Sequence, residues 1–168
     1  PGNGAGGGSG TAADPFKGLK EAQSHAQPGQ IFLLHAGIYE GSFKAVKSGE
    51  PEKPIVWRGA GDGESIVDGQ GKAAQPVSRA IEVSDVHDVW FEKLTVRNAH
   101  NTIAISCSSR IVIRRCHLFP LLYGIHATNN SKDNTSNLFI SDNLLEGPCV
   151  WPKVKEEIET PNGMYLTG

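Results

Sequence analysis

The chain has 168 residues, of which 38% are hydrophobic and 7% aromatic, and it contains 20 glycines. That is enough apolar material for one domain with a buried core, and the composition is typical of a turn-rich β protein. The formal net charge of −2 at pH 7 favours neither nucleic acid nor an anionic membrane as a partner. No apolar run approaches the roughly 18 residues of a membrane span, so we expect no membrane span in this chain.

Three cysteines (Cys107, Cys116 and Cys149) are too few for a disulfide framework and lack the spacing of zinc ligands. We expect Cys107 and Cys116 to be small core residues. The chain has neither an initiator methionine nor a signal peptide, and it stops inside a repeat. We therefore expect a mature or truncated piece of a longer protein.

Residues 1–13 form a glycine-rich segment whose composition predicts a loop. We expect a capping helix within residues 14–28, with Asp14 as its N-cap and helical residues over 15–26. An open end of a solenoid exposes apolar side chains, and this helix would cover them. Its apolar stripe consists of Phe16, Leu19, Ala22 and Ala26.

Short alternating segments follow the helix, and alternation of period two predicts strands. The first of them are Ile31–Leu34, 38–41, Pro54–Trp57 and Ser65–Val67.

A repeat of 22 residues then organises the chain. Residues 81–98 align without a gap on residues 103–120, so that Ile81 coincides with Ile103. A third copy begins at Ile125 and contains a five-residue insertion, and a fourth begins at Met164. Self-similarity at this period indicates a solenoid.

Each copy contains three short strand-like pieces, which predicts an all-β, right-handed parallel β-helix of about 22 residues per coil over residues 31–168. A leucine-rich repeat has a similar period, but its leucine consensus is absent. Ile81, Ile103 and Ile125 would then form one interior column. Asn143 takes an inward position at a corner, where a buried amide can bond to the backbone.

The motifs DPFKGLKEAQSHAQPGQIFLLHAGIYEG, KPIVWRG and SIVDGQG resemble the N-terminal part of secreted right-handed β-helix proteins of the pectate-lyase-like superfamily. Gly18 stands where that family usually has Thr, and Gln30 where it usually has Asp. The resemblance covers nearly the whole chain. It implies the fold and a secreted, extracellular or periplasmic location, but not one activity, because the superfamily contains lyases, hydrolases, epimerases and non-enzymes.

Stacking of coils places residues that are 22 positions apart in the sequence one above another, in ladders whose successive residues are about 4.8 Å apart. The outward ladder of the first strand in each copy carries Glu82, Ala104, His126 and Tyr165, with Ser84, Ser106, Thr128 and Thr167 two positions later. Such a polar face suits an extended sugar chain. This ladder carries no Lys or Arg, so the chain differs from lyases of that family, which commonly use Lys or Arg as the base.

Two insertions belong to the copy that carries His126: one is residues 128–137, just after its first strand, and the other follows Glu146, just before Tyr165. Loops of this kind carry functional residues. We therefore predict His126 as base and Tyr165 as acid in proton abstraction from a uronate sugar. Lys132, Lys153 or Lys155 would neutralise the substrate carboxylate. The predicted substrate-binding residues are Glu82, Ser106, Thr128, Lys132, Trp151 and Lys153.

These features predict an extracellular protein that acts on an acidic polysaccharide, as a lyase or C5-epimerase. The alternatives are a non-catalytic glycan-binding or cell-surface β-helix, or an inactive fragment whose missing C-terminal coils or partner would cover its open end. No cofactor or metal motif is evident. The resemblance alone implies Ca²⁺, and no cluster of Asp on the ladder suits that ion.

Overall fold

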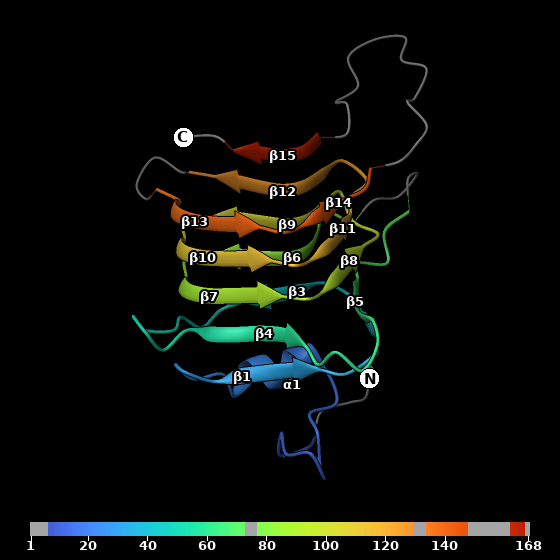
Figure 1. Cartoon of the computed structure of the whole chain (residues 1–168), viewed down its shortest axis with the longest axis vertical. Helices are drawn as coiled ribbons and strands as arrows, with labels where there is room; N and C mark the ends of the chain where they lie inside the picture. The colour runs from blue at the N-terminus through green and yellow to red at the C-terminus, as the bar shows by residue number, and fades with distance from the viewer. Residues whose placement is uncertain (1–6, 73–76, 130–133, 148–161, 167–168) are drawn as a thin grey trace.

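The computed structural model describes residues 7–72, 77–129, 134–147 and 162–166. Its strands stack in successive coils, seen edge-on in Figure 1. They form three parallel sheets of five strands each, which confirms the right-handed parallel β-helix. No helix in these ranges is long and apolar enough to cross a membrane. The predicted residues Lys132, Trp151 and Lys153, together with Cys149 and Thr167, lie outside the described ranges.

Each coil contributes one strand to each sheet. Sheet A consists of β1 (Ile31–Leu34), β4 (Ile55–Gly59), β7 (His87–Glu92), β10 (Ser109–Arg114) and β13 (Ser136–Ser141). Sheet B consists of β2 (Gly37–Glu40), β5 (Ser65–Asp68), β8 (Thr95–Arg97), β11 (His117–Phe119) and β14 (Leu144–Leu145). Sheet C consists of β3 (Phe43–Ala45), β6 (Arg79–Ser84), β9 (Asn101–Ser106), β12 (Tyr123–Thr128) and β15 (Asn162–Leu166).

The register of sheet C follows the 22-residue repeat. Ile81 pairs with Ile103, Ile103 with Ile125, and Ile125 with Met164. The three isoleucines are 0% exposed. The predicted interior column is therefore confirmed, and every side chain between two column residues along a strand points outward, because successive residues of a strand face opposite sides.

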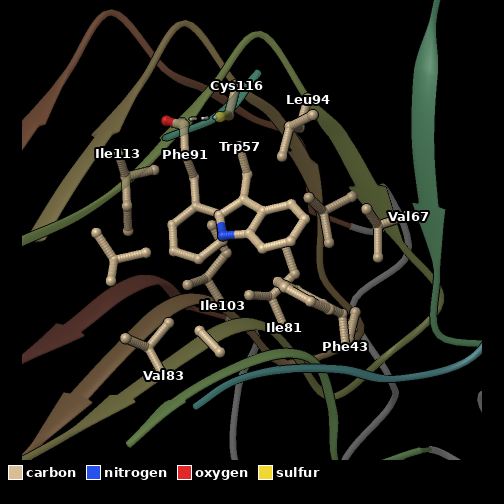
Figure 2. Packing of buried hydrophobic residues seen from close by; sticks show 14 of the residues in the cluster. Phe43, Trp57, Val67, Ile81, Val83, Phe91, Leu94, Ile103, Ile113 and Cys116 are labelled. Carbon is tan, nitrogen blue, oxygen red and sulfur yellow. Dashed lines mark hydrogen bonds between the residues drawn. The ribbon is translucent and has the colours of Figure 1, made fainter. Parts of the chain in front are cut away.

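The core of the lower coils is built on aromatic rings. Figure 2 shows Trp57 and Phe91 inside the coil, with Phe43 and Ile81 of sheet C beside them. The Trp57 ring stacks on Phe32 at 4.4 Å between centroids and meets the Phe43 ring at 4.7 Å. The aromatic side chains thus fill the space between sheets A and C near the N-terminal end.

The corners between sheets repeat as well. Lys93, Arg115 and Asp142, each just after a sheet A strand, all have φ of 54°. One left-handed residue in the same place of these three coils turns the chain toward sheet B. At the next position Asn143 accepts a bond from Cys116 N and donates one to Ile113 O, both at 2.9 Å, which confirms the predicted corner amide.

The two cysteines differ. Cys116 is 2% exposed and lies in the core, as predicted. Cys107 is only half-buried and occupies a turn with φ of 49°, so its prediction as a core residue was wrong. Its place follows β9 directly, where the chain turns out of sheet C toward sheet A.

The N-terminal helix is shorter than predicted. Helix α1 spans Leu19–Ser24, and the prediction that Asp14 caps it was wrong. The Asp14 carboxylate instead accepts a hydrogen bond from Ser9 N at 2.8 Å, and this holds residues 7–17 in turns ahead of the helix. The covering role is confirmed, because Ala22 and Ala26 are buried and Leu19 packs against the same core as Leu34 and Trp57.

At the other end of the stack, the last described strands expose apolar side chains. Met164 is 43% exposed, and Leu144 and Leu166 are each 55% exposed. One coil lower, the partners of Met164 and Leu166 are Ile125 and Ala127, which are 0% and 3% exposed, whereas Leu144 pairs with the half-buried His117. That further coils or a partner cover this end stays a prediction.

Candidate functional site on sheet C

The outward ladder predicted from the repeat exists in the structure. Glu82 pairs with Ala104, Ala104 with His126, and His126 with Tyr165, along β6, β9, β12 and β15. These strands lie one above another in Figure 1. Strand β3 adds Lys44 below Glu82, so the expectation of a ladder without Lys or Arg was wrong.

The lower end of this ladder is a cluster of charged residues that pair with one another. Glu82 binds Lys44 Nζ at 2.9 Å and Arg79 Nη1 at 3.3 Å. The hydrogen bond from Lys44 is the main reason that the pKa of the Glu82 carboxyl lies below its ordinary value. Glu82 is therefore ionised near neutral pH and serves as an acceptor of hydrogen bonds, not as a proton donor.

A row of hydroxyl groups runs beside the ladder. Ser84 donates to Glu82 Oε1 at 3.2 Å, and its oxygen lies 2.8 Å from Ser106 Oγ. Thr128 is the register partner of Ser106 on the next coil. The structure thus brings together three of the predicted binding residues, Glu82, Ser106 and Thr128, on one face.

The upper end of the ladder is aromatic. The His126 ring lies 4.9 Å from the Tyr123 ring and 5.3 Å from the Tyr165 ring, and the two tyrosine rings are 5.4 Å apart. Tyr165 is 43% exposed, whereas His126 and Tyr123 are half-buried. The predicted pair of His126 and Tyr165 is therefore in contact, and Tyr123 completes a cluster of three rings.

Sequence reasoning missed Tyr123 and its neighbour Asn101. Both continue a ladder that starts at Arg79, since Arg79 pairs with Asn101 and Asn101 with Tyr123. Their 22-residue spacing was a usable signal. It was overlooked because these residues open their strands, next to a corner where the simple alternation of inward and outward residues breaks down.

Asn101 is the polar partner of the histidine. Its amide nitrogen lies 3.2 Å from His126 Nδ1, and the residue is only 9% exposed. An amide can present either its NH₂ group or its oxygen, so it selects the imidazole tautomer. In the arrangement of the structure the NH₂ group donates to Nδ1, which leaves the proton on Nε2. If the amide is turned so that its oxygen accepts from Nδ1–H, the lone pair is on Nε2, and that is the form that would act as a base.

Two carboxylates of the described residues, Asp68 and Asp88, are paired with arginine. The structure contains no group of three or more potential ligands among His, Cys, Asp and Glu within these ranges. Asp88 is held by two bonds from Arg110, at 2.9 and 2.7 Å, and Asp68 by Arg97 and Asn98. Carboxylates that are paired with arginine in this way are poor Ca²⁺ ligands, since the ion requires several free oxygens.

Glu82 and His126 are separated by one coil, in which Ala104 is the ladder residue. Two coil spacings amount to about 9.6 Å. The ladder therefore has a charged end and an aromatic end, with a small side chain between them. Both predicted insertions join sheet C at the aromatic end, since one follows β12 and the other precedes β15.

Comparison with known proteins gives a relative and several structures of the same fold. No family model matches the chain. It is 25% identical over 146 residues to the uncharacterized protein YwoF of Bacillus subtilis (strain 168), an alignment that covers 86% of this chain and 27% of the relative. The chain thus spans about a quarter of that relative's length.

Among solved structures, an alginate lyase from Paenibacillus sp. str. FPU-7 matches 74% of this chain and 40% of its own, with a TM-score of 0.65 and 23% identity. The pectate lyase Pel9A matches 74% of this chain and 33% of its own, with a TM-score of 0.63 and 22% identity. The GH136 lacto-N-biosidase from Eubacterium ramulus matches 82% of this chain and 39% of its own, with a TM-score of 0.62 and 15% identity. Similarity at this level shows that the chain shares its parallel β-helix with carbohydrate-active enzymes of more than one reaction type.

Proposed function

We propose that the chain carries the reacting face of an extracellular lyase or C5-epimerase that acts on a uronate polysaccharide. The observation that carries the proposal is the cluster of His126, Tyr123 and Tyr165 on the outward ladder of sheet C. Two of the structural neighbours are described as lyases of alginate and pectate, which supports this substrate class.

Both reactions begin with removal of the proton on C5 of a uronate unit. His126 Nε2 would accept that proton, with the Asn101 amide turned so that its oxygen accepts from Nδ1–H. In elimination, the electron pair of the C5–H bond forms the C4–C5 double bond, and the C4–O bond breaks. Tyr165, one coil away, would then protonate the leaving oxygen. In epimerisation, the C4–O bond stays intact and a proton returns to C5 from the opposite face.

The negative charge that develops on the sugar carboxylate needs a cation nearby. We assign this role to Lys132, Lys153 or Lys155, which belong to the insertions that follow β12 and precede β15 in the sequence. The cations that the structure describes on this face, Lys44 and Arg79, already pair with Glu82. They lie at the opposite end of the ladder, where they suit the binding of a more distant part of the chain.

Glycoside hydrolysis is less well supported. That reaction uses two carboxyl groups roughly 5–9.5 Å apart. In the described part of the sheet C face, Glu82 is the carboxylate of the ladder, and its ion pairs keep it from acting as the acid. A non-catalytic glycan-binding face remains the second candidate, because the same rings and hydroxyls can bind a sugar chain without reacting with it.

The test incubates the protein with alginate, pectate and glycosaminoglycans, and follows unsaturated products by ultraviolet absorbance and epimerised units by proton NMR. We expect His126→Ala to lower turnover at least about 100-fold, the usual minimum for a general base. His35→Ala is the matched control, since His35 is exposed in the first coil and pairs with Asp62. Sugar binding without turnover would favour the second candidate.

A further inference from the structure

A cavity of about 430 Å³ opens at the corner between sheets B and C. It lies where β2, β5 and β8 end, on successive coils. Its lining includes two carboxylates, two amides, one ammonium group and one apolar side chain, namely Glu40, Asp68, Gln70, Asn98, Lys72 and Leu121. None of these residues belongs to the cluster around His126.

One wall of the cavity is held rigid by hydrogen bonds. Asp68 accepts bonds from Arg97 Nε at 2.7 Å, from Gln70 N at 2.8 Å and from Asn98 Nδ2 at 3.0 Å. A side chain on Gly71 would meet the carbonyl oxygen of Asn98 at 2.7 Å, so the backbone here is closely packed. The Asp68 oxygens are used within the protein, and the carboxylate therefore orients Asn98 for a ligand instead of binding the ligand itself.

The remaining lining suits a sugar with an acidic group. Glu40 and Gln70 supply acceptors and donors for ring hydroxyls, and Leu121 supplies an apolar contact. Lys72 is exposed and forms no ion pair with any residue of the described ranges. An ammonium group that lines a polar cavity, and has no carboxylate partner in the described part of the chain, is a binding point for an anionic group of a ligand.

Two residues of the cavity lining are close in the chain to the candidate site. Asn98 is three residues before Asn101, which contacts His126, and Leu121 is two residues before Tyr123, whose ring also contacts His126. Three residues of chain span at most about 11 Å. The cavity thus lies within a few sugar units of the His126 cluster.

We propose that the corner cavity is a subsite for one uronate unit of the polysaccharide, with Lys72 pairing to the sugar carboxylate and Glu40, Gln70 and Asn98 binding its hydroxyls. The substrate class rests on the proposed function. The subsite fixes the position of the chain while a unit further along it reacts at His126.

Calorimetric titration tests the subsite without turnover. The titrated protein carries His126→Ala, and the ligands are uronate oligosaccharides from two to six units and the same hexamer with its carboxyl groups reduced to alcohols. We expect Lys72→Met to raise the Kd of the hexamer about tenfold, the effect of one charge-assisted bond. Lys72→Arg should restore binding, because it keeps the charge. Lys20→Met is the matched control, because Lys20 is an exposed residue of α1.

The charge of the ligand provides the other comparison. The effect of Lys72→Met should vanish with the reduced hexamer, which has no carboxylate to pair with Lys72. Equal hexamer affinity in Lys72→Met and Lys20→Met, or an equal loss for the reduced hexamer, would overturn the subsite.

The two proposals fail separately. Turnover that depends on His126, with hexamer binding that is indifferent to Lys72, would reject the subsite alone. Binding that depends on Lys72, with no turnover of any uronate polysaccharide by the unmodified protein, would reject the reaction alone. Absence of any uronate binding would reject both.

Discussion

Asn101 and His126 lie on adjacent coils of sheet C, with the Asn101 amide nitrogen 3.2 Å from His126 Nδ1. Asn101 is nearly buried at 9% exposure, so this amide is held in place while the histidine stays accessible. The pair places a fixed hydrogen-bonding group behind the ring that would take the substrate proton. A histidine in such a setting has its tautomer chosen by the protein.

Asn101→Asp should raise the pKa of His126. A carboxylate beside Nδ1 favours the charged imidazolium, which moves the pKa upward by about one unit or more. The acid limb of the pH profile for kcat should then move to higher pH, because the neutral base appears only above the raised pKa. NMR titration of the His126 ring measures the same shift independently of activity. An unchanged titration would show that Asn101 does not control the histidine.

Glu92 should be important for stability. Its side chain is 4% exposed and lies between Arg58 Nε at 2.5 Å and Arg114 Nε at 2.6 Å, on the outer side of sheet A. Glu92→Ala leaves two half-buried guanidinium groups facing each other, so we expect a loss of about 3 kcal/mol in the free energy of unfolding. Urea denaturation measures it. Glu50→Ala is the control, because Glu50 and Lys53 form an exposed pair 3.9 Å apart that contributes at most about 0.5 kcal/mol.

Acid should destabilise the fold partly through Asp88. The hydrogen bonds from Arg110 are the main reason that the pKa of Asp88 is lowered below its ordinary value. A carboxyl whose pKa is lower in the folded state adds stability above its unfolded pKa of about 3.9, and this contribution is lost as pH falls through the folded value. The urea concentration at the unfolding midpoint should therefore decrease as the pH falls below about 4. In Asp88→Asn this decrease should be smaller. A drop of the same size in both proteins would contradict the assignment.

The interior column should tolerate truncation poorly. Ile103 is 0% exposed between Ile81 and Ile125, so Ile103→Ala should cost about 3 to 4 kcal/mol of unfolding free energy through the lost apolar contacts and the cavity. Ile38→Ala is the comparison, since Ile38 is 45% exposed and should cost about 1 kcal/mol or less. Similar losses at both positions would show that the coils do not share one packed interior.

The two described cysteines should react at different rates. Burial raises the pKa of the Cys116 thiol to about 11, so at about pH 8 it is protonated and shielded, and it should react with a disulfide reagent only on unfolding. Cys107 is half-buried in a turn and should react in the folded protein. Replacing Cys149 with Ser leaves these two thiols to be counted. Rapid labelling of both in the native state would contradict the burial of Cys116.

The parts of the structure that could be predicted from the sequence are those that the repeat determines. A constant spacing of 22 residues specifies which side chains stack, so the column of Ile81, Ile103 and Ile125 followed directly. The ladder from Glu82 to Tyr165 followed from the same spacing, because neighbouring residues of a strand face opposite sides. The corner amide of Asn143 was predictable for the same reason.

The other features of the structure depend on contacts that do not follow the 22-residue repeat. Strand β3 pairs with β6 although Phe43 and Ile81 are 38 residues apart, so the ladder could not be extended to Lys44 by counting. The start of α1 was misplaced because the Asp14 carboxylate binds Ser9 instead of the helix. The corner cavity depends on the path of irregular segments between sheets B and C, which sequence pattern alone does not specify.

The most direct measurement of the central claim uses a uronate oligosaccharide that carries deuterium at C5. Elimination and epimerisation both release that deuterium to water, and mass spectrometry or NMR follows the loss. The account predicts release by the unmodified protein and by His35→Ala, and at least about 100-fold slower release by His126→Ala. Release at an unchanged rate by His126→Ala would contradict the role of sheet C as the reacting face.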